Sequence, residues 1–171
     1  MNKIFIYDDL LIKNIYQKLN INPTNEILAE TTGKLYMINK IPVMLMPNDI
    51  SPMRGNRRVI GAIYTFHKQD MTKVLDTLDS YKLCSMSRIN MRNPMDLTYR
   101  TIIQVYPIVF NNIHELLNFR YKYLETVTCY AYIGNTQNKR ILNCILKDRH
   151  KKLSDGCYKQ GLQDILNRLN I

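Results

Sequence analysis

The chain has 171 residues, of which 46% are hydrophobic and 22% are charged, and its 24 basic and 14 acidic residues give a net charge of +10. This length predicts a single domain spanning residues 1–171, and the composition excludes an intrinsically disordered chain. The positive charge suits an anionic partner, but a solvated basic surface is the simpler explanation, so we do not expect nucleic acid to be the partner.

The sequence contains no signal for a membrane or for a metal. It has no apolar run of about 18 residues, the length that a transmembrane helix needs. The start MNKIFIYDDL reaches acidic residues after a short apolar run, unlike a signal peptide. Its four cysteines form no C-x-x-C pair, which argues against a zinc site. We expect a cytoplasmic protein with reduced thiols, no membrane contact and no bound metal.

The first half of the chain is rich in predicted strands. Lys3–Tyr7 has the β-branched and aromatic residues of a strand and ends at the acidic pair Asp8-Asp9. Leu10–Leu19 has apolar residues at helical spacing. Further on, the patterns predict strands at Glu26–Tyr36 and Pro42–Met46 around a turn at Asn39-Lys40, and then a loop at Pro47–Arg58.

The second half alternates strands with a few helices. Val59–Phe66 is a strong buried-strand pattern, and Gln69–Ser80 has one apolar helical face. Residues 81–98 predict a long loop, and loops of this length are often functional. The later predictions are a strand at Tyr99–Phe110 that ends or kinks near Pro107, an insertion with a short helix at Asn111–Tyr123, a strand at Glu125–Ile133, a basic stretch at Lys139–Lys152 and a helix at Asp155–Leu169.

Consecutive strands with few helices between them favour a mixed or closed sheet over a doubly wound one. We therefore predict an α/β protein of the α+β kind.

Several motifs in this order resemble the gamma-glutamylcyclotransferase-like family, whose fold is a small mixed β-barrel with flanking helices. The likeness extends over most of the chain. Its motifs are Tyr7-Asp8-Asp9-Leu10-Leu11 for a Tyr-Gly-Ser/Thr-x-Leu turn, Val59-Ile60-Gly61-Ala62-Ile63-Tyr64 for a V-x-G-x-V/I-Y strand, Leu75-Asp76-Thr77-Leu78-Asp79 for an L-D-x-x-E helix, Tyr99-Arg100, and a tail with Tyr130–Ile133 and Gly156–Leu162.

The resemblance implies a gamma-glutamyl cyclotransferase-type lyase. In that reaction the α-amine of a gamma-glutamyl group attacks its own γ-carbonyl, which releases 5-oxoproline and an amine or amino acid. No cofactor is required, because the substrate carries its own nucleophile. Asp79 takes the place of the family's catalytic Glu and is the candidate general base. The alternative is that Asp79 simply ends a helix on the solvent side.

The candidate substrate-binding residues are the turn Tyr7, Asp8, Asp9 and Leu10, together with Tyr99 and Tyr132. In the family a Gly at the place of Asp8 lets the backbone approach the substrate, so two aspartates here disfavour a substrate carboxylate or favour a cationic ligand. Asp near a helix N-cap explains the pair equally well. The tyrosines either line the pocket or fill the barrel. Arg100 either binds an acidic group or is an ordinary edge-strand residue.

Two other functions stay open beside the lyase. A catalytically inactive or repurposed member would bind a ligand or a protein partner, and a homodimer is compatible with either function. A nucleic-acid-binding protein is supported only by the net charge of +10.

Overall fold

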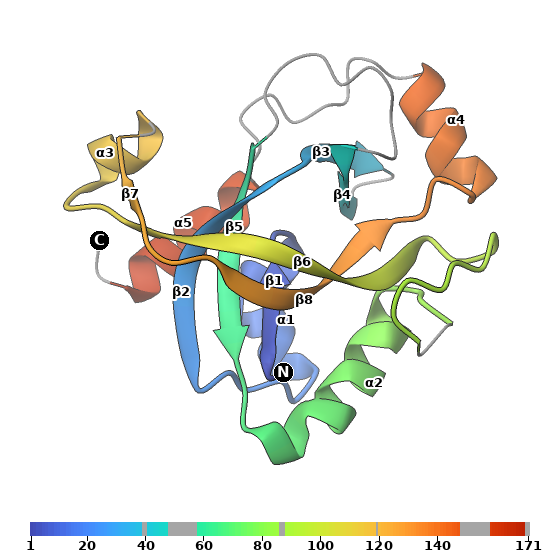
Figure 1. Ribbon diagram of the computed structural model, residues 1–171, viewed down its shortest axis with the longest axis horizontal. Helices are drawn as coiled ribbons and strands as arrows, with labels where there is room; N and C mark the ends of the chain where they lie inside the picture. The colour runs from blue at the N-terminus through green and yellow to red at the C-terminus, as the bar shows by residue number, and fades with distance from the viewer. Residues whose placement is uncertain (39–40, 48–57, 86–87, 119, 148–157, 170–171) are drawn as a thin grey trace.

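The computed structural model describes residues 1–38, 41–47, 58–85, 88–118, 120–147 and 158–169. Five strands form a barrel in the order β2–β5–β1–β8–β6, and β6 closes it by pairing with β2 (Figure 1). β1 and β8 are parallel, and the other neighbours are antiparallel. The strands are β1 (Lys3–Ile6), β2 (Asn25–Thr32), β5 (Arg58–Thr65), β6 (Thr98–Val109) and β8 (Val127–Gly134). The predicted mixed barrel is confirmed.

The alternation of side chains along the strands builds two cores. Inside the barrel, residues from all five strands pack together, among them Phe5, Ala29, Ile63, Val105 and Ala131. The intervening residues, such as Ile4, Ile60 and Tyr64, face outward and pack in the cluster that includes the helices. Alternate residues of each strand are therefore buried on both sides of the barrel, because helices cover much of its outside.

Gly61 allows β1 and β5 to approach closely at the end of β1. A Cβ at this position would lie only 2.1 Å from the carbonyl oxygen of Ile6. The glycine of the V-x-G-x-V/I-Y motif thus places the end of β1, and with it the turn that begins at Tyr7.

Three helices cover the outside of the barrel: α1 (Lys13–Lys18), α2 (Met71–Tyr81) and α5 (Lys159–Arg168), and a 3-10 turn, η3 (Lys68–Asp70), leads into α2 (Figure 1). Met71, Val74 and Leu78 bury one face of α2, as their spacing predicts. A further helix, α4 (Lys139–Lys147), follows β8, and its residue Ile141 packs on the hairpin of β3 (Lys34–Ile38) and β4 (Ile41–Leu45).

Several local predictions differ from the structure. The segment Leu10–Leu19 is not one helix, because Ile12 is extended (φ −80°, ψ 119°) between a 3-10 turn, η1 (Asp9–Leu11), and α1. β6 does not end at Pro107 but continues to Val109. Proline removes only a donor there, and its carbonyl still accepts from the amide of Leu124 at 2.9 Å.

Three other predictions agree only in part. The predicted strand Glu26–Tyr36 is two strands, β2 and β3, which lie in different sheets. The basic stretch Lys139–Lys152 begins with the helix α4, and within the described residues the last helix begins at Lys159. The insertion holds a short helix, α3 (Ile113–Leu117), and a short strand, β7 (Lys122–Tyr123), that pairs with β6. The turn at Asn39-Lys40, residues 48–57 of the predicted loop and residues 148–157 lie outside the described residues. Among the described residues, no helix combines the length and the apolar character needed to cross a bilayer.

Candidate functional site

The acidic turn after β1 is closed by its own side chain. Asp8 is the N-cap of η1, and its Oδ1 accepts a hydrogen bond from the amide of Leu10 at 3.1 Å. The amide of Leu11 donates to the carbonyl of Asp8 at 3.0 Å. The turn therefore directs these two N–H groups at Asp8, which satisfies the capping interpretation of the Asp pair.

Lys82, just beyond α2, brings one positive charge to this turn. Its ammonium contacts Asp8 Oδ2 and lies 3.4 Å from Asp9 Oδ1. The side chains of Lys82 and Asp8 are only 7% and 4% exposed, so this ion pair is buried. The hydroxyl of Tyr81 donates to Asp9 Oδ2 at 2.5 Å. Burial raises the pKa of the Asp8 carboxyl, and the nearby Lys82 ammonium opposes that rise.

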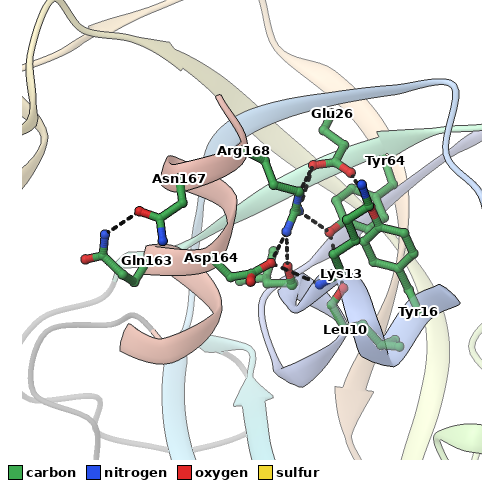
Figure 2. Close-up of polar contacts among 10 residues, drawn as sticks. Leu10, Lys13, Tyr16, Glu26, Tyr64, Gln163, Asp164, Asn167 and Arg168 are labelled. Carbon is green, nitrogen blue, oxygen red and sulfur yellow. Dashed lines mark hydrogen bonds and ion pairs between the residues drawn. The ribbon is translucent and has the colours of Figure 1, made fainter. Parts of the chain in front are cut away.

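The turn is also held from behind by α5 (Figure 2). Arg168 donates to the carbonyl of Leu11 at 3.0 Å and forms an ion pair with Glu26 at 2.7 Å. The hydroxyl of Tyr64 donates to the carbonyl of Leu10 at 3.2 Å. The side chain of Leu10, a predicted substrate-binding residue, is buried in the outer core and lines neither of the cavities described below. These contacts fix the backbone of the turn relative to the barrel.

Asp79 lies near the end of α2, where Arg100 and Tyr132 hold its carboxylate. Arg100 Nη1 is 3.2 and 3.0 Å from the two carboxylate oxygens, and the Tyr132 hydroxyl donates to Oδ1 at 2.6 Å. Burial raises the pKa of the Asp79 carboxyl, while Tyr132 and Arg100 oppose the rise. Arg100, from the predicted Tyr-Arg pair, thus binds an acidic group of the chain itself.

Two of the predicted tyrosines connect the turn with Asp79. The hydroxyl of Tyr7 donates to the carbonyl of Tyr132 at 2.6 Å, and the side chain of Tyr132 reaches Asp79. Tyr99 has a different neighbour: the guanidinium of Arg92 lies 4.0 Å from the centre of its ring and 2.7 Å from its hydroxyl. All three tyrosines are buried with hydroxyl partners, as barrel-filling aromatics would be.

Two cavities open beside these residues, and they divide the predicted site. Asp79 lines a cavity of about 960 Å³ that lies between α2, residues 83–85 and 94–97, and the start of α4. Tyr7, Asp8 and Asp9 line a smaller cavity of about 240 Å³, whose other walls come from the β3–β4 hairpin, the start of α4, the end of α2 with the two residues after it, and Leu97 and Thr98. Both cavities share three lining residues, Leu83, Leu97 and Arg140, so they are neighbours.

The long loop predicted at residues 81–98 forms one wall of the larger cavity. The side-chain amide of Asn135 donates to the carbonyls of Asn93 and Asp96 at 2.7 and 3.2 Å. The side-chain amide of Asn138 donates to the carbonyl of Met95 at 3.1 Å. These bonds attach the loop to the segment between β8 and α4. Within the described residues, no group of three or more His, Cys, Asp or Glu side chains is arranged to hold a metal ion.

The arrangement of barrel and helices occurs in a protein of known structure. A glutathione-specific gamma-glutamyl cyclotransferase from yeast matches 82% of this chain and 72% of its own chain, with a TM-score of 0.52 and 14% sequence identity. This chain has a gamma-glutamylcyclotransferase-like fold. A protein of Arabidopsis thaliana covers 99% of this chain and 93% of its own, with a TM-score of 0.49 and 10% identity. In sequence, the chain matches no family model and no curated protein.

In this gamma-glutamylcyclotransferase-like fold, three residues of the site were missed from the sequence. Lys82 and Tyr81 bind the acidic turn, and Arg140 lines both cavities. The sequence gives little signal for Lys82, because a lysine after a helix is most often a solvated residue. The structure brings Tyr7, Asp8 and Asp9 together at one cavity and places Asp79 with Tyr132 beside the other.

Proposed function

We propose that this chain is a gamma-glutamyl cyclotransferase-type lyase that releases 5-oxoproline from a gamma-glutamyl amine or amino acid. The observation that carries the proposal is the placement of Asp79. Asp79 lines a cavity of about 960 Å³, its carboxylate is oriented by Arg100 and Tyr132, and the pKa of this carboxyl is raised by burial. A raised pKa makes a carboxylate a better proton acceptor near neutral pH.

The reaction needs one proton acceptor and a bound conformation of the substrate. Asp79 takes a proton from the α-ammonium of the substrate. The freed amine then attacks the γ-carbonyl of the same gamma-glutamyl group. A new C–N bond closes the five-membered ring, the bond to the leaving amine breaks, and the leaving nitrogen takes up the proton. Because nucleophile and carbonyl belong to one molecule, correct orientation supplies much of the rate. Arg100 and Tyr132 act here by holding the carboxylate of Asp79.

The proposal is tested by measuring 5-oxoproline released from gamma-glutamyl amines and gamma-glutamyl amino acids. We expect the wild-type protein to form product and Asp79→Asn to lose at least about a hundredfold in rate, since Asn accepts no proton. Asp79→Glu should keep activity, because it retains the carboxylate. The matched control is Asp70→Asn, an exposed aspartate directly before the same helix. Product from Asp79→Asn at the wild-type rate, or none from folded wild-type protein with any substrate, would contradict the proposal.

A second function is favoured by a different observation. The carboxylate of Asp8 already occupies the amide of Leu10 and the ammonium of Lys82, two groups that would otherwise suit a bound carboxylate. This arrangement supports a non-catalytic member that binds a ligand or a protein partner. In that case Asp79→Asn and the wild-type protein bind a gamma-glutamyl ligand with equal affinity in calorimetry. Neither of these two proteins releases 5-oxoproline.

A further inference from the structure

Leu83 has a backbone conformation that a leucine side chain disfavours. It follows the end of α2, and its φ of 52° lies in the left-handed region. The amide of Leu83 donates to the carbonyl of Ser80 at 3.3 Å. The amide of Cys84 donates to the carbonyl of Asp79 at 2.9 Å. These two bonds form the Schellman motif, in which glycine is the usual residue at the position of Leu83. A residue with a Cβ is destabilising there, so the leucine needs a second explanation.

Packing within the chain does not supply that explanation. Leu83 is 55% exposed, unlike the buried leucines of the two cores. It lines both cavities beside Leu97, whose amide donates to the carbonyl of Leu83 at 3.2 Å. Disfavoured backbone conformations persist where the surrounding structure imposes them, and they cluster at ligand sites. A ligand in the adjacent cavity would bury this side chain and so account for a leucine at this position.

The smaller of the two cavities has apolar walls that suit such a ligand. Its volume of about 240 Å³ is below the usual range of drug-sized sites, whereas an apolar cavity of about 150 Å³ is large enough for benzene. A short aliphatic group therefore fits. The apolar walls beside Leu83 come from the β3–β4 hairpin and from α4, which packs on that hairpin (Figure 1), and they include Ile38, Ile41, Pro42, Val43 and Ile141.

The same cavity also carries an excess of negative charge. Asp8 and Asp9 line it with one buried cation, Lys82, so these three side chains have one negative charge in excess. The side chain of Asp9 is 28% exposed, and its Oδ1 lies 3.4 Å from the Lys82 ammonium, so this oxygen has the capacity for a further hydrogen bond. The other lining cation, Arg140, is exposed, so solvent and salt screen its charge. These charges favour an ammonium group over a carboxylate.

We propose that the smaller cavity binds an aliphatic amine. The ammonium group lies at Asp9, and the alkyl chain packs against Leu83 and the β3–β4 hairpin. Leu83 thus selects ligands for an apolar chain, and Asp9 selects them for a positive charge. This binding site is distinct from the cavity that Asp79 lines, and the proposal does not depend on the lyase activity.

The test compares n-butylamine with two probes that each lack one of its features. Methylamine lacks the longer chain, and butyrate lacks the positive charge. Binding is followed at neutral pH, where both amines are protonated, by titration of backbone amide chemical shifts, a method that suits weak ligands. We expect n-butylamine to bind at least about fivefold more tightly than either probe, because burial of its additional methylene groups and its positive charge both favour binding.

Two variants assign this preference to the proposed residues. Leu83→Gly should weaken n-butylamine binding at least about threefold and leave methylamine binding unchanged. It should leave the urea midpoint of unfolding nearly unchanged, because relief of the left-handed conformation offsets the lost side-chain contacts. Asp9→Asn should weaken the binding of both amines. The matched control is Leu124→Gly, at a leucine that is 53% exposed and lines neither cavity, and it should leave all three affinities unchanged.

The possible results distinguish the amine site from the lyase. The amine site is overturned by no binding of n-butylamine, by equal affinity for n-butylamine and methylamine, or by tighter binding of butyrate than of n-butylamine. An n-butylamine affinity that Leu83→Gly leaves unchanged, or that Leu124→Gly lowers as much, overturns it as well. Wild-type protein that shows the expected preference but releases no 5-oxoproline overturns the lyase alone. Release of 5-oxoproline without that preference sustains the lyase and overturns the amine site.

Discussion

Substituting Lys82 tests whether the buried ion pair stabilises the acidic turn. In Lys82→Met the apolar part of the side chain is largely kept, while the ammonium that contacts Asp8 and Asp9 is lost. The Asp8 carboxylate would keep its bond from the amide of Leu10 but would be buried without a cation. Removing one partner of a buried ion pair typically costs about 3–5 kcal/mol. We expect a loss of about 3 kcal/mol in the free energy of unfolding at pH 7, because the bond from Leu10 remains.

The loss should depend on pH in a defined direction. The pKa of Asp8 is raised in the folded protein, so the folded state binds a proton more tightly than the unfolded state. Such a group contributes stability at low pH and loses it as the pH rises through its folded pKa. Without Lys82 the opposing effect is gone and the pKa rises further. The deficit of Lys82→Met relative to wild type should therefore be largest near pH 7–8 and shrink as the pH falls toward about 5.

Urea denaturation of both proteins between pH 5 and 8 measures this deficit. Lys73→Met, at an exposed lysine on α2, is the control for replacing a lysine by methionine near this site and should change little. The double variant Lys82→Met/Asp8→Asn should recover part of the lost stability, because it removes the stranded charge. A deficit below about 1 kcal/mol, or one that stays constant across this pH range, would refute the reasoning.

Three further predictions follow from other contacts. Arg100→Met removes a charge that lowers the pKa of Asp79, so the acidic limb of the pH–rate profile for 5-oxoproline release should move to higher pH; an unmoved limb would argue against Asp79 as the base. Gly61→Ala places a Cβ against the carbonyl of Ile6 and should destabilise the fold by more than about 2 kcal/mol in urea denaturation. Arg168→Met should lower the free energy of unfolding by about 1–3 kcal/mol in the same assay, because the partly buried ion pair with its carboxylate neighbours is lost. An unchanged free energy of unfolding would contradict the anchoring of the turn by α5.

The parts of the fold predicted from the sequence are those that depend on local pattern. The strand at Val59–Phe66 and the apolar face of α2 are confirmed, because the spacing of apolar residues reports directly on burial. The break at Ile12 was not predictable, since Leu11, Ile12 and Ile15 keep helical spacing across it. The spacing of apolar residues indicates which side of a segment is buried, but it does not determine the backbone angles φ and ψ of a single residue.

The candidate site was harder to predict, because its contacts join distant segments. Lys82 lies 74 positions from Asp8 along the chain, and nothing near either residue indicates the pairing. The roles proposed for Asp79 and the tyrosines stay predictions, although the bonds among Tyr7, Tyr132 and Asp79 are now defined. The separation into two cavities depends on how residues 83–85 and 94–97 pack, which no periodic pattern encodes.

The anchoring of the acidic turn by α5 has a consequence for biosynthesis. Arg168 holds the carbonyl of Leu11 across a separation of 157 residues. A ribosome adds roughly 5–20 residues per second, so the turn emerges several seconds or more before its anchor is made. During that interval the β1 strand and the turn are present without α5, so α5 does not yet bury their apolar residues. The site is therefore assembled late, and the segment that waits longest for its partners is the one that carries Asp8 and Asp9.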